Sequence, residues 1–219
     1  MQKQRGFTLI EIAIVLVIIG LLLGGVLKGQ ELIKNAKVRN TISSMDELKA
    51  AIFGFQDRYR ATPGDMLNAS TLVGTNAVNC TGSKCGNGLI EPWPETSIVT
   101  NNLSVAGFYT GAFSTKIINA IPTAATAPTN PWGGAMFVAY WYPFNENGAR
   151  SKVSRPGIYT GGGISSAVLA EIDRKIDDGN PGSGSFRAGY PYDTSVACVA
   201  KNTWVTAVPG SNCAGTNLY

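Results

Sequence analysis

Apolar and polar positions follow different patterns in successive parts of the chain. From Phe7 to Leu27 the run is apolar, and only Thr8 and Glu11 interrupt it. At 1.5 Å per residue, a helix of this length crosses about 30 Å of hydrocarbon, whereas an ordinary signal peptide has a shorter apolar core. The run therefore predicts a membrane-spanning helix that is kept in the mature protein.

From Glu31 to Arg60 the pattern becomes one-sided. Apolar residues recur every three or four positions, which is the spacing of an amphipathic helix. They are Val38, Ile42, Met45, Leu48, Ile52, Phe55 and Tyr59. Pro63 and Gly64 then favour a turn that ends the helix. A coiled-coil dimer could use the same stripe, but strand-rich sequence follows, so we expect the helix to lie across a sheet.

After residue 61, short apolar segments alternate with clusters of Gly, Asn, Thr, Ser and Pro. The predicted strands are Ala135–Tyr142, Lys152–Thr160, Val196–Lys201 and Thr203–Val208, the last two forming a hairpin near Asn202. Helical spacing predicts a short helix over Ser166–Ile176. The expected fold is α+β, with a long N-terminal helix packed on a small antiparallel β-sheet head. The topology of about 67–130 is left open.

Charge and composition narrow the possible functions. The formal net charge is +4. Residues 1–61 carry nine Lys or Arg and five Asp or Glu, whereas residues 62–219 carry nine of each. The predicted head therefore lacks the basic excess that drives nucleic-acid binding. Histidine is absent, which removes Ser–His–Asp and Cys–His catalysis and histidine metal ligands. We expect a protein that is not an enzyme.

All four cysteines follow the apolar run, at Cys80, Cys85, Cys198 and Cys213. A Cys₄ zinc site usually has two close pairs, and the wide spacing of the second pair fits that poorly. Disulfides formed in an oxidising compartment fit better. The sequence permits three pairings, of which Cys80–Cys85 with Cys198–Cys213 needs the least chain closure. We predict this local pairing.

Glu11 is the one acidic residue of the apolar run. A carboxylate near the end of a spanning helix costs a few kcal/mol unless it finds a partner or reaches the interface. Glu11 lies about one turn from the start of the run, so an extension toward the headgroups explains it on physics alone. A role in assembly needs a positive partner, and the run itself contains no Lys or Arg.

The segment from Lys3 to Glu11 reads KQRGFTLIE and resembles the processing motif of type IV prepilins and type II secretion pseudopilins. The resemblance rests on a basic leader, a Gly–Phe junction and a glutamate four residues after the phenylalanine. It implies that a membrane peptidase cleaves between Gly6 and Phe7 and that Phe7 is then N-methylated. It also implies that Glu11 attracts the methylated amine of a neighbouring subunit during assembly, which we prefer to the headgroup explanation.

Two further segments resemble a subset of bacterial prepilin-type proteins. Arg58–Met66 (RYRATPGDM) resembles their step from helix to head, and Ile172–Pro181 (IDRKIDDGNP) resembles a segment near their C-terminus. Some pseudopilins hold calcium in a C-terminal loop, which makes weak calcium candidates of Asp173, Asp177, Asp178 and Asn180. Their spacing does not match an EF-hand, and helix capping and turn formation explain Asp and Asn before Gly. We expect no cofactor, with calcium as the lesser alternative.

Two features near the span allow more than one interpretation. The glycines suit close helix approach, local melting or simple tolerance in a spanning helix, and they are Gly20, Gly24, Gly25 and Gly29. Basic residues follow the span, and the positive-inside tendency alone would put the head in the cytoplasm. They are Lys28, Lys34, Lys37 and Arg39. The cysteines and the leader predict the opposite orientation, which we prefer.

The predicted segments are a cleaved leader at 1–6, a transmembrane and assembly helix at 7–30, its amphipathic continuation at 31–61 and a globular α+β head at 62–219. The resemblance implies a structural subunit of a type IV pilus or pseudopilus filament. Its partners would be copies of itself or related pilins, a prepilin peptidase and the inner-membrane assembly platform. The precursor would be a single-pass protein of the bacterial inner membrane with its head outside the cytoplasm, and the filament would be periplasmic or extracellular.

The alternative function is that of a low-abundance minor pilin acting as an adhesive or ligand-binding module. Its candidate contact residues are Trp93, Trp132, Trp141 and Trp204. Packing inside the head is the more ordinary use of such rings. The sequence does not assign the chain to a major or a minor subunit, or to a pilus or a pseudopilus.

Overall fold

The computed structural model describes residues 9–113, 120–142, 144–189, 198–207 and 209–219. The chain forms two compact units, Met1–Val38 and Arg39–Tyr219. The first unit holds the N-terminal part of helix α1 (Leu9–Tyr59), and the second holds the rest of α1 and the head. Predicted Gly6 and Phe7 lie outside the described residues.

Helix α1 has the apolar and amphipathic halves that the sequence predicts. The sequence has no proline before Pro63, so no proline breaks the backbone hydrogen bonds of α1. The helix ends where Arg60 adopts a positive φ of 51° while its N–H still donates to the carbonyl of Gln56 at 2.9 Å. A residue in the left-handed backbone conformation commonly ends a helix.

Within the second unit, one face of α1 is fully buried. Thr41, Met45, Leu48, Ile52 and Phe55 have no exposed surface. Burying each large apolar side chain contributes roughly 1.5–3 kcal/mol, so this face is a main source of head stability. The prediction of a helix packed on the head is confirmed, and the coiled-coil alternative is not needed to explain the stripe.

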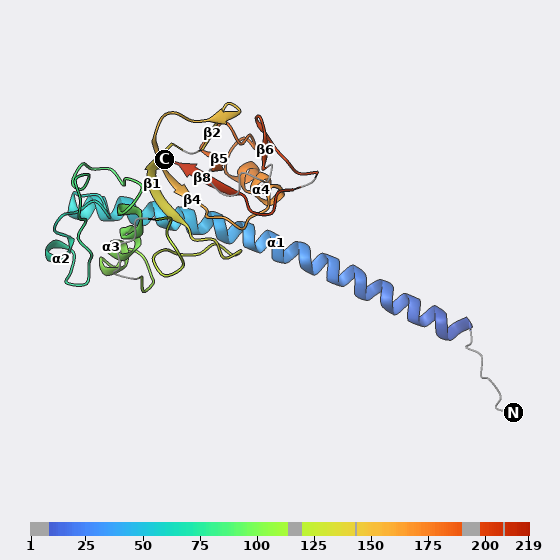
Figure 1. The fold of residues 1–219 in the computed structure, drawn as a ribbon. Helices are drawn as coiled ribbons and strands as arrows, with labels where there is room; N and C mark the ends of the chain where they lie inside the picture. The colour runs from blue at the N-terminus through green and yellow to red at the C-terminus, as the bar shows by residue number, and fades with distance from the viewer. Residues whose placement is uncertain (1–8, 114–119, 143, 190–197, 208) are drawn as a thin grey trace. The chain divides into compact units, whose positions relative to one another are not determined.

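The main sheet has four antiparallel strands in the order β1-β4-β8-β5 (Figure 1). These strands are β1 (Phe137–Trp141), β4 (Arg155–Tyr159), β8 (Ala214–Leu218) and β5 (Phe186–Gly189). The pairing register places Phe137 opposite Tyr159, and their rings stack with centroids 4.8 Å apart. Strand β8, last of the four in sequence, lies in the interior of the sheet between β4 and β5.

Two small hairpins and one helix surround this sheet. The hairpins pair β2 (Asn145–Glu146) with β3 (Ala149–Arg150), and β6 (Val199–Ala200) with β7 (Thr203–Trp204). Helix α4 (Ser166–Ile176) packs against β5, β7 and β8. Its bounds equal the predicted ones, and the hairpin turn falls at the predicted Asn202.

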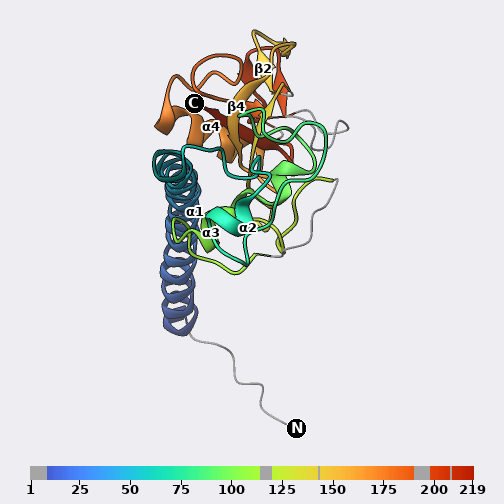
Figure 2. The ribbon, with the colours of Figure 1, turned by 90° about the vertical axis from the view of Figure 1, so that its left-hand side faces the viewer.

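The region with open topology contains short helices joined by loops. They are α2 (Ala69–Leu72), the 3₁₀ helix η1 (Glu95–Ser97) and α3 (Val99–Val105). Helices α2 and α3 lie side by side in both views (Figures 1 and 2). Buried Asn102 joins this region to the end of α1, because its side-chain oxygen accepts the N–H of Gly64 at 2.9 Å.

Candidate functional site

Glu11 lies in the first turn of α1 as described, on an exposed surface. Its apolar neighbours are exposed as well, and Leu9 is 89% and Ile10 67% accessible. Among the described residues, α1 is the one helix that is long and apolar enough to cross a membrane. An apolar surface of this extent needs hydrocarbon or other apolar helices around it.

The four glycines of this part of α1 make no contact within the chain that requires a glycine. A Cβ atom added at Gly20, Gly24, Gly25 or Gly29 would meet nothing within 4 Å. Glycine disfavours helix by up to about 1 kcal/mol relative to alanine, and no packing in the described chain offsets that cost. Contacts within the chain therefore do not explain these glycines, whereas close approach of a helix from another molecule would.

The four cysteines form two disulfides, Cys80–Cys85 and Cys198–Cys213, with Cα–Cα distances of 5.8 and 5.9 Å. These are the two bonds of the local pairing. The second bond joins Cys213, just before β8, to Cys198, just before β6, and the Cys213 N–H also donates to the backbone carbonyl of Ile164 at 2.8 Å. The disulfide therefore links the start of the β6–β7 hairpin to the segment leading into β8.

The PGD sequence after α1 clamps the first disulfide loop. Asp65 is 4% exposed, and its carboxylate accepts the backbone N–H groups of Gly86 at 2.5 Å and Gly88 at 2.7 Å. Gly64 has a φ of 88°, and a Cβ there would lie 2.9 Å from the carbonyl oxygen of Glu95. The prepilin-like step from helix to head thus has a structural explanation in this chain.

The second prepilin-like segment ends α4 in a network of side-chain bonds. The carboxylate of buried Asp173 accepts the indole N–H of Trp204 at 2.6 Å and the N–H of Gly179 at 3.1 Å. Asp177 accepts the backbone N–H of Phe186 at 2.7 Å. These bonds hold β5 and β7 against the end of α4.

Two of these carboxyl groups have opposite pKa shifts. Burial, followed by a hydrogen bond with Asp177, raises the pKa of Asp173 to about 8. Burial also acts to raise the pKa of Asp177, but the hydrogen bonds from Asp173 and from backbone N–H groups outweigh it and hold that pKa below its ordinary value. A protonated Asp173 therefore donates to an ionised Asp177 near neutral pH.

The calcium candidates lie close together. Carboxylate oxygens of Asp173, Asp177 and Asp178 lie within 4.8 Å of one another. Their oxygens also accept turn hydrogen bonds, as Asp178 does from the N–H of Asn180 at 2.8 Å. Asn180 in turn accepts the N–H of Gly182 at 3.0 Å. Such bonds support the turn interpretation, and calcium binding stays a prediction of lower rank.

The candidate tryptophans pack within the head. Trp204 is buried, and its ring lies 6.5 Å from that of Phe186. Trp93 and Trp141 contact each other at 5.6 Å between ring centroids, and Trp141 also lies against Tyr159. Trp132 is half-buried. Trp93, Trp141 and Trp204 thus take part in packing, although Trp93 and Trp141 are only half-buried.

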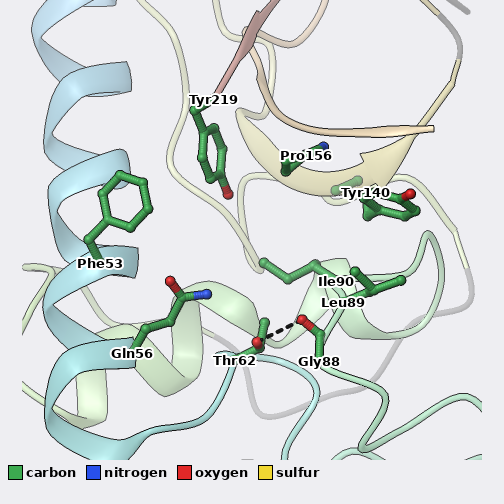
Figure 3. Close-up of a pocket in the computed structure, with 10 residues that line it drawn as sticks. Phe53, Gln56, Thr62, Gly88, Leu89, Ile90, Tyr140, Pro156 and Tyr219 are labelled. Atoms are coloured by element: carbon green, nitrogen blue, oxygen red, sulfur yellow. Dashed lines mark hydrogen bonds between the residues drawn. The ribbon is translucent and has the colours of Figure 1, made fainter. Parts of the chain in front are cut away.

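A cavity of about 320 Å³ separates the end of α1 from the sheet within the second unit. Figure 3 shows Phe53 and Gln56 of α1 facing Tyr219, with Tyr140 and Pro156 beyond it. The Phe53 and Tyr219 rings meet edge to face at 5.6 Å. This cavity is lined mainly by apolar groups and contains no cluster of catalytic side chains among the residues drawn.

A long apolar helix followed by a small antiparallel sheet defines a pilin-like α+β architecture. Residues 1–27 match the family model of the prokaryotic N-terminal methylation motif, the signature of type IV prepilins and pseudopilins. No match was found among curated proteins or among solved structures. The N-terminus therefore carries the signature of type IV prepilins and pseudopilins, and together with the apolar helix it fits a membrane-anchored precursor.

Proposed function

We propose that the mature chain is a structural subunit of a type IV pilus or pseudopilus filament. The observation that carries this proposal is the methylation motif at residues 1–27, placed at the start of a helix whose apolar surface is exposed. Pilin-type precursors are processed by a prepilin peptidase and assembled into filaments. The same surface that anchors the precursor in the membrane would pack against other subunits once it leaves the membrane.

Processing would remove the leader at 1–6 by cleavage between Gly6 and Phe7, followed by N-methylation of Phe7. Segment 7–30 would then serve for membrane insertion and assembly, 31–61 would support the head, and 62–219 would form the filament surface. The precursor would sit in the inner membrane with its head outside the cytoplasm. Two disulfides in the head support this orientation, because such bonds persist in oxidising compartments.

Assembly would bring Glu11 into a bundle of apolar helices. An ion without compensation is strongly disfavoured there. The methylated amine of Phe7 on a neighbouring subunit would offset that cost and fix the axial register between subunits. Partners would be copies of this chain or related pilins, delivered by the inner-membrane assembly platform.

The alternative, a minor pilin that binds a surface or ligand, gains little from Trp93, Trp141 and Trp204 because their rings pack against other rings of the head. The two roles differ in copy number. We expect this chain to dominate sheared filaments by mass, as a major subunit does. A scarce but reproducible presence would favour the minor role instead.

The direct test of the proposed function is the variant Gly6→Val. It should leave full-length precursor in the membrane and no filaments, because a branched side chain replaces the small residue before the scissile bond. Mass analysis of the wild-type N-terminus should show a methylated Phe7. As a control, Gly29→Val alters a glycine beyond the motif and should be cleaved normally. Assembled material that begins with Met1 would refute the assignment.

A further inference from the structure

A second cavity, of about 470 Å³, lies at the Cys80–Cys85 loop. Lys84, Cys85, Trp93 and Glu95 are among the residues that line it. The loop is fixed by two backbone hydrogen bonds, from the Cys80 N–H to the Met66 carbonyl at 2.7 Å and from the Gly86 N–H to the Asp65 carbonyl at 3.0 Å. Neither bond depends on the disulfide.

Glu95 is the unusual residue of this cavity. The residue has no exposed surface. Its Oε2 atom accepts the backbone N–H of Glu91 at 2.7 Å, but its Oε1 atom has no hydrogen-bond partner within the described parts of the chain. Leaving a buried carboxylate oxygen unsatisfied is costly, so such an atom calls for an explanation. A ligand that binds in another state of the protein would supply one.

Reduction of the Cys80–Cys85 disulfide would provide that second state. The sulfur atoms of Cys80 and Cys85 and a carboxylate oxygen of Glu95 lie within 4.8 Å of one another. Around a tetrahedral zinc ion, bonds of about 2.3 Å to sulfur and about 2.0–2.2 Å to oxygen bring the ligand atoms to within roughly 4 Å of each other. Small side-chain movements after opening of the disulfide would therefore suffice.

We propose that reduction of Cys80–Cys85 creates a zinc site whose ligands are Cys80, Cys85 and Glu95. A two-electron reductant such as a dithiol breaks the S–S bond and supplies two protons, which gives two thiols while the dithiol becomes a disulfide. Zinc then displaces both thiol protons and binds the two thiolates and the carboxylate. A water molecule from the cavity completes the tetrahedron. The head is thus closed by a disulfide in one redox state and by a metal in the other.

The test uses the full mature chain in detergent, treated with a phosphine reductant and titrated with Co²⁺ as a spectroscopic substitute for Zn²⁺. Reduced wild type should bind one Co²⁺ with thiolate charge-transfer absorption and tetrahedral d–d bands, and Zn²⁺ should displace it. Oxidised wild type should bind none. Failure of reduced wild type to bind either metal would overturn the proposal.

Because the reductant opens both disulfides, the experiment must show which pair of cysteines binds the metal. The double variant Cys198→Ser/Cys213→Ser should keep the Co²⁺ spectrum, and Cys80→Ser/Cys85→Ser should lose it. The reverse outcome would place the metal elsewhere and refute the site. Circular dichroism would show whether either double variant is folded.

Glu95→Gln tests the carboxylate while all four cysteines remain. Its affinity for Zn²⁺ should fall by at least about tenfold, since loss of even an outer-shell partner costs that much. The matched control is Glu91→Gln, which changes the neighbouring carboxylate that lies 3.5 Å from Lys84 and should bind zinc like wild type. Equal affinities in the two variants would exclude Glu95 as a ligand, even if a cysteine double variant failed to fold.

Discussion

In the first turn of α1, the carboxylate of Glu11 lies among exposed apolar side chains. Glu11→Gln removes its charge but keeps its size, so insertion and cleavage should continue while assembly is impaired. We expect shear-released filament per membrane-bound mature protein to fall at least about tenfold, which corresponds to about 1.4 kcal/mol per subunit. Glu11→Val should be as severe or worse.

The control for this experiment is Glu31→Gln, which removes the same charge from the same helix beyond the apolar run. Glu31 forms an exposed ion pair with Lys28 at 2.7 Å, an interaction of little energetic weight. This variant should assemble normally. Wild-type assembly by both Glu11 variants would instead favour the headgroup explanation of Glu11.

Asp173 and Asp177 make the stability of the head depend on pH. Folded Asp173 has a pKa of about 8 against an ordinary value of 3.8, so between these values the folded chain holds a proton that the unfolded chain releases. The free energy of unfolding should therefore fall as pH rises through this range, by at most about 1.4 kcal/mol per pH unit. Asp177, with its lowered pKa, contributes the opposite trend below about pH 4.

Asp173→Asn should flatten the dependence between pH 4 and 8, because an amide resembles the protonated acid and does not titrate. Urea unfolding of the oxidised protein at several pH values measures this. Asp178→Asn changes the exposed neighbour and should keep the wild-type slope. Identical slopes for wild type and Asp173→Asn would show that Asp173 is ionised in the folded state.

At the scale of elements, α1 stabilises the head through its buried face. Leu48→Ala should lower the free energy of unfolding by about 2–5 kcal/mol, as buried leucine truncations do. Leu72→Ala is a matched control on α2, where the leucine is 54% exposed, and it should cost under about 1 kcal/mol. Similar losses for both would mean that the α1 face is not part of the cooperative core.

Elements with strong local patterns could be predicted from the sequence, and others could not. The regular spacing of apolar residues gave α4 its bounds, and dense aromatic residues located β1. Strand β8 reads AGTNL, which has neither alternation nor β-branched density beyond one threonine, yet every residue in it is buried. Its position depends on pairing with β4 and β5, which a local pattern does not record.

Some residues of the candidate sites could likewise be predicted from the sequence, and others could not. Glu11 was identified because a carboxylate is rare in an apolar run, and the methylation motif has fixed spacing. Glu95 gave no such signal, because its burial depends on loops that only the folded head brings together. Asp65 lies in the prepilin-like segment Arg58–Met66, but only the structure shows that its carboxylate binds the backbone N–H groups of Gly86 and Gly88.

At the scale of the whole head, the Cys198–Cys213 disulfide should be a main determinant of stability. It spans a sequence separation of 15 residues, for which the chain-entropy model gives roughly 3 kcal/mol. Cys198→Ser/Cys213→Ser should lose about that amount in denaturant unfolding. Non-reducing peptide mapping of wild type should recover this bond and Cys80–Cys85. A double variant as stable as wild type would show that the pairing of β8 suffices without the bond.

The interior position of β8 also sets an order of events in folding. Strands β4 and β5 do not pair with each other, and each meets β8, which follows both in the chain. Closing such non-local contacts costs loop entropy before the pairing repays it. The main sheet therefore cannot be completed until residues 214–218 have been synthesised and can pair with β4 and β5. Until then β1 and β4 can pair with each other, but β5 has no partner strand in this sheet.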